Sequence, residues 1–232
     1  MDMAELLPNL YLLPFPFGHV YFYRDADTVT AIDTGVAGSA PVIAEALRRL
    51  GLPPGAVRNV VLTHHHQDHA GSASELAAWG ADVLAHRDDA PVVRGERLAA
   101  PPVFTGAPAW ERELYASLPS LPPAPPCPVH RELADGDVID FGGGATVVGA
   151  PGHTDGSIAI HLPGPRVLFT GDAVAANGDE VILGVFNTDR ARAIRSLRRL
   201  AELDVDVVCF GHGEPVVGGA AAALRAAAER VA

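Results

Sequence analysis

The residues best suited to chemistry lie in one short run, Thr63-His64-His65-His66-Gln67-Asp68-His69. His64 and His66 are two positions apart, so an extended segment projects both side chains to the same side. Asp68 and His69 follow at the start of a predicted helix. Imidazole nitrogens and carboxylate oxygens bind zinc, and a catalytic zinc usually takes three ligands from the protein. The run offers four ligands, and this surplus predicts a site for two metal ions.

Three later segments each place one potential ligand after a predicted strand and directly after a glycine. These ligands are His153, Asp172 and His212. Glycine lets the backbone turn sharply and approach an ion closely. A single residue of this kind is more often a helix cap or a surface residue. Together with the histidine run, the three residues favour metal binding.

The elements around these residues predict an α/β fold. Strand patterns alternate with helix patterns through residue 85, as is typical of layered α/β proteins. One helix is expected over Ser39–Leu50 and a second over Ser72–Trp79, where Ser72 and Glu75 have the spacing of a capping box. Strands are expected at Leu10–Leu13, Val20–Tyr23, Thr28–Asp33, Asn59–Thr63, Asp82–Ala85, Val138–Phe141, Thr146–Val148, Ile158–His161, Val167–Phe169 and Val207–Phe210, and further helices at Arg190–Leu203 and Ala220–Val231.

Residues 98–128 interrupt this alternation. The stretch is rich in proline and has one expected helix, around Trp110–Leu118. Long connections of this kind usually form lids or binding loops when they are ordered. We therefore expect residues 1–232 to form one catalytic domain with a lid-like excursion at about 98–128.

The composition excludes several functions. The chain has 232 residues, 48% of them hydrophobic, and a formal net charge of −11. Nucleic-acid binding depends on clusters of basic residues, and the arginines here are scattered. Cys127 and Cys209 lie in no paired motif, which predicts no disulfide framework and fits a reducing cytosol. With no signal peptide and no apolar run of transmembrane length, we expect a cytoplasmic protein with a small-molecule substrate, no nucleic-acid partner and no membrane.

The motifs H-x-H-x-D-H, GHT-x-GS, TGD and GHG, in this order, resemble those of the metallo-β-lactamase-like hydrolases, in the branch that includes glyoxalase II. The resemblance covers almost the whole chain. It implies a four-layer αβ/βα sandwich with the active site at one edge of the two sheets.

The resemblance also implies a divided ligand set: three histidines for one ion, a carboxylate and two histidines for a second, and a carboxylate that bridges the two ions. In that order, the residues are His64, His66 and His153; Asp68, His69 and His212; and Asp172. Two zinc ions per chain are expected, with iron or manganese as alternatives. In Ile32-Asp33-Thr34-Gly35, Asp33 would lie behind the ligands and orient the histidine run by hydrogen bonds.

Two such ions, about 3.5–4 Å apart, can share a hydroxide and polarise a substrate oxygen. The expected activity is hydrolysis of a small ester, thioester or lactone by zinc-bound hydroxide, with Asp68 as the catalytic residue that holds or passes the proton. The sequence departs from two members of the resembled family, and each departure argues against one substrate-binding mode. About one helix follows His212, where glyoxalase II carries a glutathione-binding domain, and Ala175 replaces the tyrosine that lactonases carry three residues after the bridging aspartate.

Other classes stay open. A mononuclear iron persulfide dioxygenase uses the same scaffold with two histidines and one carboxylate on the ion. The second, complete ligand set favours hydrolysis instead. A phosphodiesterase or nuclease is disfavoured by the acidic charge. A binding module without catalysis would have no use for a full ligand set.

Two regions are candidates for substrate contact. Phe17 and His19 lie at the tip of a predicted hairpin, which in the resembled family borders the pocket. In the excursion, Trp110, together with Phe104 and Tyr115, offers apolar surface that a lid can lay on a small organic substrate. The alternative is that these aromatic residues only pack against the sheet.

Overall fold

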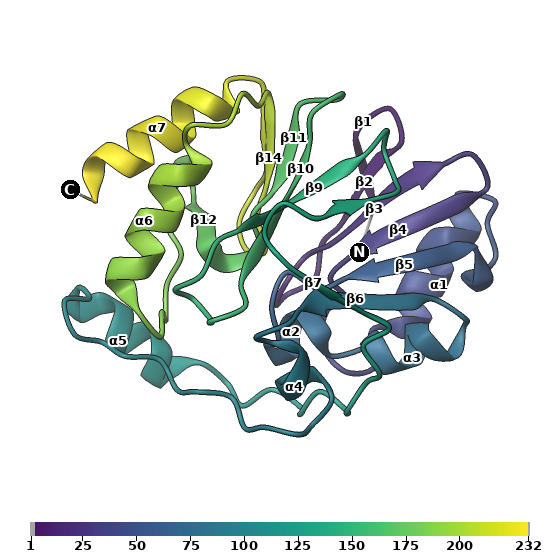
Figure 1. Cartoon of the computed structure of the whole chain (residues 1–232), viewed down its shortest axis with the longest axis horizontal. Coiled ribbons are helices and arrows are strands. Elements are labelled where there is room, and N and C mark those ends of the chain that lie inside the picture. The colour runs from purple at the N-terminus through teal and green to yellow at the C-terminus, as the bar shows by residue number, and fades with distance from the viewer. Residues whose placement is uncertain (1–2, 232) are drawn as a thin grey trace.

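Two β-sheets lie face to face in the computed structural model, which describes residues 3–231 (Figure 1). Helices cover the outer face of each sheet: α1 (Ala40–Arg49) and α3 (Ala73–Ala78) on one side, α6 (Arg190–Leu200) and α7 (Ala220–Arg230) on the other. The layers are therefore helix, sheet, sheet, helix. This confirms the four-layer αβ/βα sandwich.

The N-terminal sheet has seven strands that lie side by side in sequence order. Neighbouring strands are antiparallel up to β4 and parallel from β4 to β7. The strands are β1 (Ala4–Leu7), β2 (Leu10–Leu13), β3 (Val20–Asp25), β4 (Thr28–Ile32), β5 (Val57–Val61), β6 (Asp82–His86) and β7 (Arg131–Leu133).

The second sheet has the order β15-β14-β11-β10-β9-β8. Its strands are β8 (Val138–Ile139), β9 (Ala145–Gly149), β10 (Ile158–Leu162), β11 (Val167–Phe169), β14 (Val207–Cys209) and β15 (Val216–Val217). A separate hairpin of β12 (Val174–Asn177) and β13 (Glu180–Leu183) contacts α7. The short helices are α2 (Gln67–Ala70), α4 (Ala90–Val93) and α5 (Ala109–Ser117).

Apolar side chains form three core layers, one between each pair of neighbouring layers. Successive strand residues point to opposite faces of a sheet. Leu168 therefore packs with Leu197 of α6, whereas Phe169 packs between the two sheets. On the other side, Ile43 of α1 packs with Phe22 of β3, and both are fully buried.

The topology brings six loops to one edge of the sandwich. Strands β4, β5 and β6 are parallel, so their carboxyl ends lie together. In the second sheet β9, β11 and β14 share one direction, because β10 is antiparallel to both β9 and β11 and β11 is parallel to β14. The residues that follow these six ends are Asp33, the histidine run and Asp89 in the first sheet, and His153, Asp172 and His212 in the second.

The expected elements are present, with ends within three residues of their expected positions. The capping box was wrong. Ser72 precedes α3 but makes no side-chain capping bond. Instead its hydroxyl donates to Val36 and accepts from the Ser39 amide, and Glu75 accepts from the Gly38 amide. These bonds tie α3 to the start of α1.

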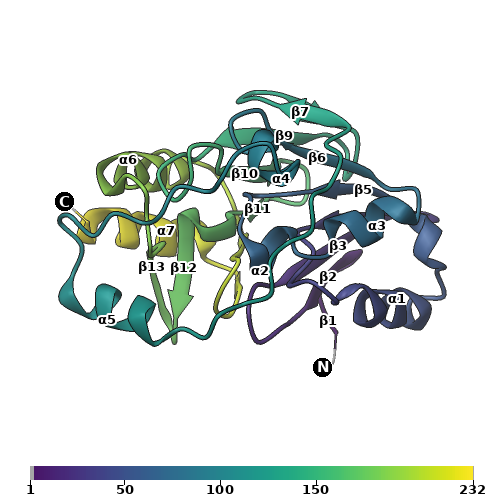
Figure 2. The same cartoon turned by 90° about the horizontal axis from the view of Figure 1, so that it is seen from below.

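The excursion at 98–128 runs along the lower edge of the molecule in Figure 1, from α4 to α5 and back to β7. Figure 2 shows the molecule from the edge that the excursion crosses. Helix α5, within the excursion, is exposed over most of its length. Among the described residues, no helix is both long and apolar enough to cross a membrane.

Candidate metal centre

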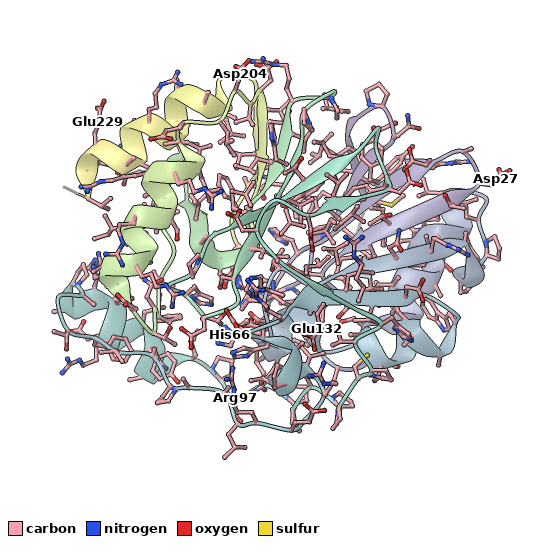
Figure 3. All side chains as sticks on the ribbon, viewed as in Figure 1. Asp27, His66, Arg97, Glu132, Asp204 and Glu229 are labelled. Atoms are coloured by element: carbon pink, nitrogen blue, oxygen red, sulfur yellow. The ribbon has the colours of Figure 1, made fainter. Side chains whose placement is uncertain are left out.

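The structure brings all seven expected ligands to one place, where the two sheets meet. Three overlapping groups each have their ligand atoms within 4.8 Å of one another: His64, His66 and His153; His64, His69 and Asp172; and Asp68, His69 and His212. Figure 3 shows His66 near the middle of the molecule, among side chains that converge from both halves. That these residues bind ions remains a prediction, but their convergence was expected from the motifs.

In the first group the ring nitrogens face one another. His66 Nδ1 lies 3.0 Å from His64 Nε2 and 2.9 Å from His153 Nε2. His64 and His153 are almost fully buried. The Asp172 carboxylate is within reach of both, because its Oδ2 lies 3.9 Å from His64 Nε2 and 3.6 Å from His153 Nε2.

Three of the imidazoles are oriented by hydrogen bonds at Nδ1, on the side of the ring that faces away from the centre. His153 Nδ1 lies 2.9 Å from the carbonyl oxygen of Val185, and His69 Nδ1 lies 2.8 Å from Asp33 Oδ2. Both acceptors can only accept, so each Nδ1 carries a proton and each Nε2 is the ring atom that faces the centre. His64 Nδ1 is 3.1 Å from the Thr63 hydroxyl, which itself donates to Asp33. All three Nε2 atoms thus point at the centre, the arrangement of metal-ligating histidines.

Asp68, His69 and His212, together with Asp172, form a second group that combines histidines with carboxylates. His212 Nε2 lies 3.2 Å from Asp68 Oδ2 and 3.3 Å from Asp172 Oδ2. His69 Nε2 lies 3.3 Å from Asp172 Oδ1. His212 is 40% exposed and Asp68 only 16%, so this group forms the solvent side of the centre.

The two groups differ in electrostatics. Burial and the neighbouring histidines hold the pKa of His64 and of His66 well below the usual range, so both rings are neutral. In the second group, Asp172 raises the pKa of His212 to about 10. Burial opposes ionisation of Asp68, but His69 and His212 outweigh it and lower its pKa to about 2. The second group is therefore a set of charges that compensate one another.

These residues fit a divalent cation. Asp172 Oδ1 is buried and has no hydrogen bond among the described residues. Burial lowers the pKa of His64 and of His153, and the one proton of each ring is engaged at Nδ1, so their inward-facing Nε2 atoms have lone pairs and no donor. Unpaired buried acceptors of this kind are costly unless a cation satisfies them. Nitrogen and carboxylate donors together suit zinc, iron or manganese.

Two glycines permit close approach at the centre. A Cβ at Gly211 would collide with Asp172 Oδ1 and would lie 2.6 Å from His69 Cε1. A Cβ at Gly18, at the tip of the β2–β3 hairpin, would collide with the backbone oxygen of Asp68. The hairpin tip therefore packs against the histidine run, and the His19 amide donates to the Gly211 oxygen at 2.9 Å.

Asp33 lies where the resemblance implies, directly behind the histidine run. It accepts hydrogen bonds from the amide and the hydroxyl of Thr63, at 2.8 and 2.7 Å, in addition to the bond from His69. Its backbone has a φ of +62°, in the left-handed region that aspartate tolerates better than most residues. One buried carboxylate thus positions both ends of the run.

The sequence reasoning missed Asp89, which links the two histidine loops. This residue is 1% exposed and accepts hydrogen bonds from the His65 amide at 3.0 Å, the Thr154 hydroxyl at 2.8 Å and the Gly156 amide at 2.8 Å. His65 lies between two expected ligands and Thr154 follows a third. The sequence did contain a signal for Asp89, because this carboxylate follows β6, the strand next to the one that leads into the histidine run.

The candidates for substrate contact lie in different places. Phe17 and His19 lie at the hairpin tip beside the centre. Trp110 is on α5, where it lines a cavity of about 330 Å³ together with Glu111, Val185 and Arg190. Phe104 and Tyr115 stack on each other at 5.4 Å, and Tyr115 lies 5.1 Å from the ring of Phe186. Their contact with a substrate remains a prediction.

The fold and the convergent ligands are those of a known class, and the chain belongs to the metallo-beta-lactamase superfamily, which its sequence matches over residues 13–212. This confirms the resemblance seen in the motifs. Membership of this superfamily implies that the protein binds divalent metal ions, and the chain has the His and Asp groups that could hold them.

Individual relatives are moderately similar. The chain is 28% identical to the "Probable metallo-hydrolase YflN" of Bacillus subtilis, over 92% of this chain and 87% of the relative. It is 31% identical to a "Hydroxyacylglutathione hydrolase" of Cereibacter sphaeroides, over 84% of this chain but only 62% of that enzyme's length. Among solved structures, the metallo-beta-lactamase family protein TTHA1429 of Thermus thermophilus is 29% identical with a TM-score of 0.71, covering 98% of this chain and 79% of that one.

Proposed function

We propose that this protein is a metal-dependent hydrolase of a small ester, thioester or lactone, working with two zinc ions. One ion would be held by His64, His66 and His153. The other would be held by Asp68, His69 and His212. Asp172 would serve both.

The main observation behind the proposal is the direction in which the imidazole Nε2 atoms point. The Nδ1 protons of His64, His69 and His153 are all engaged behind the centre, and their Nε2 atoms converge with two carboxylates in front. This arrangement suits cations and leaves none of these three imidazoles free to serve as the general base of a nucleophilic serine or cysteine. Both cysteine thiols are buried in the core, which also argues against covalent catalysis.

Divalent ions bound here would supply a nucleophilic water near neutral pH and would withdraw charge from the substrate oxygen under attack. The chain's own contribution is orientation and charge. Asp33 and the Val185 carbonyl keep His69 and His153 in the required tautomer. Asp68 would hold or pass the proton, and its ionised state and its position on the solvent side of the centre support this role.

The substrate class rests on similarity and on charge. Hydroxyacylglutathione hydrolases, which are among the relatives, are named for a thioester substrate. The formal net charge of −11 disfavours long polyanions such as nucleic acids.

We further propose that the excursion at 98–128 covers the centre and sets the choice of substrate. In support, the Gln67 side-chain amide lies 3.0 Å from the carbonyl oxygens of Leu121 and Pro122, so the excursion passes against α2.

Metal content and a hydrolytic panel test the proposal. Protein reconstituted with zinc should hold close to two ions per chain and should hydrolyse at least one activated ester, thioester or lactone without oxygen. A maximum of one ion after reconstitution would contradict the two-ion centre.

The same preparation separates hydrolysis from the dioxygenase alternative. Iron-loaded protein should consume no oxygen with glutathione persulfide. Oxygen uptake by the iron form, combined with zinc protein that is inert on the whole panel, would overturn the hydrolase proposal.

A further inference from the structure

Glu111 is a buried carboxylate in an otherwise exposed helix. It is 2% exposed, whereas the residues of α5 that follow it, Arg112 through Ser117, are all exposed. Nothing in the proposed chemistry uses it. A buried acidic side chain is rare unless it is paired, so its partners show what it does.

One partner of Glu111, Phe186, lies in the segment that joins β13 to α6, and the other, Arg190, is the first residue of α6. The Phe186 amide donates to Oε1 at 2.6 Å, and the Arg190 guanidinium donates to Oε2 at 3.1 Å. A second bond holds the same segment, from the Val103 amide to the Asn187 oxygen at 2.8 Å. The excursion is thus anchored beside the second half of the sandwich, where α5 lies next to the hairpin of β12 and β13 in Figure 2.

The other face of this segment holds His153. The Val185 oxygen accepts from His153 Nδ1 at 2.9 Å, and the Thr188 amide donates to the His153 oxygen at 3.2 Å. The Val185 carbonyl and the Phe186 amide belong to one peptide group. That single group therefore has Glu111 on its N–H side and the imidazole of His153 on its C=O side.

A carboxylate on the N–H of a peptide polarises its carbonyl, because hydrogen bonds in series strengthen one another. The Val185 oxygen then accepts more strongly from His153, and the ring becomes a better electron donor at Nε2. Asp33 does this for His69 directly. Glu111 does it through one intervening peptide.

The backbone supports the same conclusion. Phe186 has a φ of +59°, in the left-handed region that bulky side chains avoid. Such a conformation persists only when its surroundings impose it. The bonds of this peptide to Glu111 on one side and to His153 on the other hold its orientation.

We propose that Glu111 is a positioning residue for the metal centre, which orients and polarises His153 through the Val185–Phe186 peptide. The excursion then contributes to the ligand field as well as to the covering of the site. The inference rests on the proposed metal centre, because His153 must be a ligand for the effect to matter.

The test compares Glu111→Gln with Glu113→Gln, an exposed glutamate two positions later on the same helix. In the metal-free protein, NMR of the Phe186 amide proton and the His153 Nδ1 proton reports the relay without any ion. We expect both signals to move upfield in E111Q and to stay in place in E113Q. In zinc titrations, E111Q should bind about 10-fold more weakly, at the lower end of the range for residues behind a ligand.

Glu111→Asp keeps the charge and should show a smaller shift of the same sign. It also serves if E111Q does not fold. An unchanged His153 signal in both variants would overturn the inference and leave Glu111 as an anchor for α5 only. Wild-type protein that takes up no zinc would contradict the proposed function, whereas the NMR comparison would still decide the relay.

Discussion

The strand-end loops and the excursion at 98–128 lie against each other but are built in opposite ways. The loops are short and buried, and backbone or carboxylate hydrogen bonds hold their side chains from behind. The excursion is long and largely exposed, and a few contacts hold it, such as those of Glu111, Val103 and Gln67.

This difference separates two tasks. A cation requires ligand atoms at fixed positions, so its loops need orientation from outside the ligand set. A wall that meets an organic substrate needs shape and apolar surface, which a loosely held segment can supply. Glu111 is the exception, because it belongs to the excursion but acts on a ligand loop.

The largest effect is expected from Asp172→Ala, which removes the carboxylate that faces both ligand groups. Leaving buried cationic partners uncompensated costs about 3–5 kcal/mol, so metal affinity and turnover should fall by about 10²- to 10³-fold or more. The fold should survive, since the residue adds little to the core. Zinc content, turnover and circular dichroism together check this. Near-normal activity would remove Asp172 from the centre.

Asp89→Asn should have the next largest effect. An amide cannot accept all three hydrogen bonds that the Asp89 carboxylate accepts from the two histidine loops. We expect zinc affinity to fall about 10- to 100-fold, as for residues that orient ligands. Asp88→Asn is the matched control, because its side chain is 50% exposed and adjacent in sequence. Equal zinc affinities for the two variants would show that the hydrogen bonds of Asp89 are not needed to position the two histidine loops.

Tyr115→Ala tests the excursion as a wall of the substrate site. The substitution removes the ring between Phe104 and Phe186. If the excursion covers the centre, the ratio of kcat/KM between a bulky and a small acyl ester should change about 10-fold, as for a lost apolar contact in a pocket. Leu118→Ala, at the exposed end of α5, is the control. A large loss of thermal stability with unchanged selectivity would support packing alone.

The last expected effect requires no substitution and is a difference in the rates at which the two thiols react. Burial raises the pKa of Cys127 to about 11 and that of Cys209 further still, so both thiols stay protonated and unreactive in the folded protein near pH 8. Modification must then follow opening. Cys127 ends the excursion, whereas Cys209 lies in a central strand, and local opening is easier where fewer contacts hold a segment. Cys127 should react about 10-fold faster or more, as peptide mapping after timed alkylation would show. Equal rates would mean that the excursion opens only with the whole fold.

The sequence predicted what depends on residue type and spacing. The histidine run and the three glycine-preceded ligands could be read because their chemistry is unusual for a strand end, and the structure brings all seven together. The alternation of strands and helices predicted an α/β fold, and the family resemblance implied the four layers. The hairpin of β12 and β13 was missed, although Gly178-Asp179 between two apolar runs is a hairpin signal.

Asp89 and Glu111 were not predicted for a physical reason. A carboxylate in a sequence is usually a solvated surface residue, and only tertiary contacts show that these two are buried and bonded. The capping box failed in the same way, because Ser72 and Glu75 have partners in the loop before α1 that local spacing does not show. Ligands can be recognised from their type, whereas the residues that position them require the fold.

The origin of the ligands in both sheets has a mechanical consequence. His66 and His153 are 87 residues apart in the chain, and His69 and His212 are 143 apart. An ion held by either pair acts as a cross-link between the two halves, comparable to a disulfide that closes a long loop. It removes conformational entropy from the unfolded chain and adds binding free energy to the folded one. The metal centre would thus stabilise the fold by linking the two halves of the sandwich, in addition to its catalytic role.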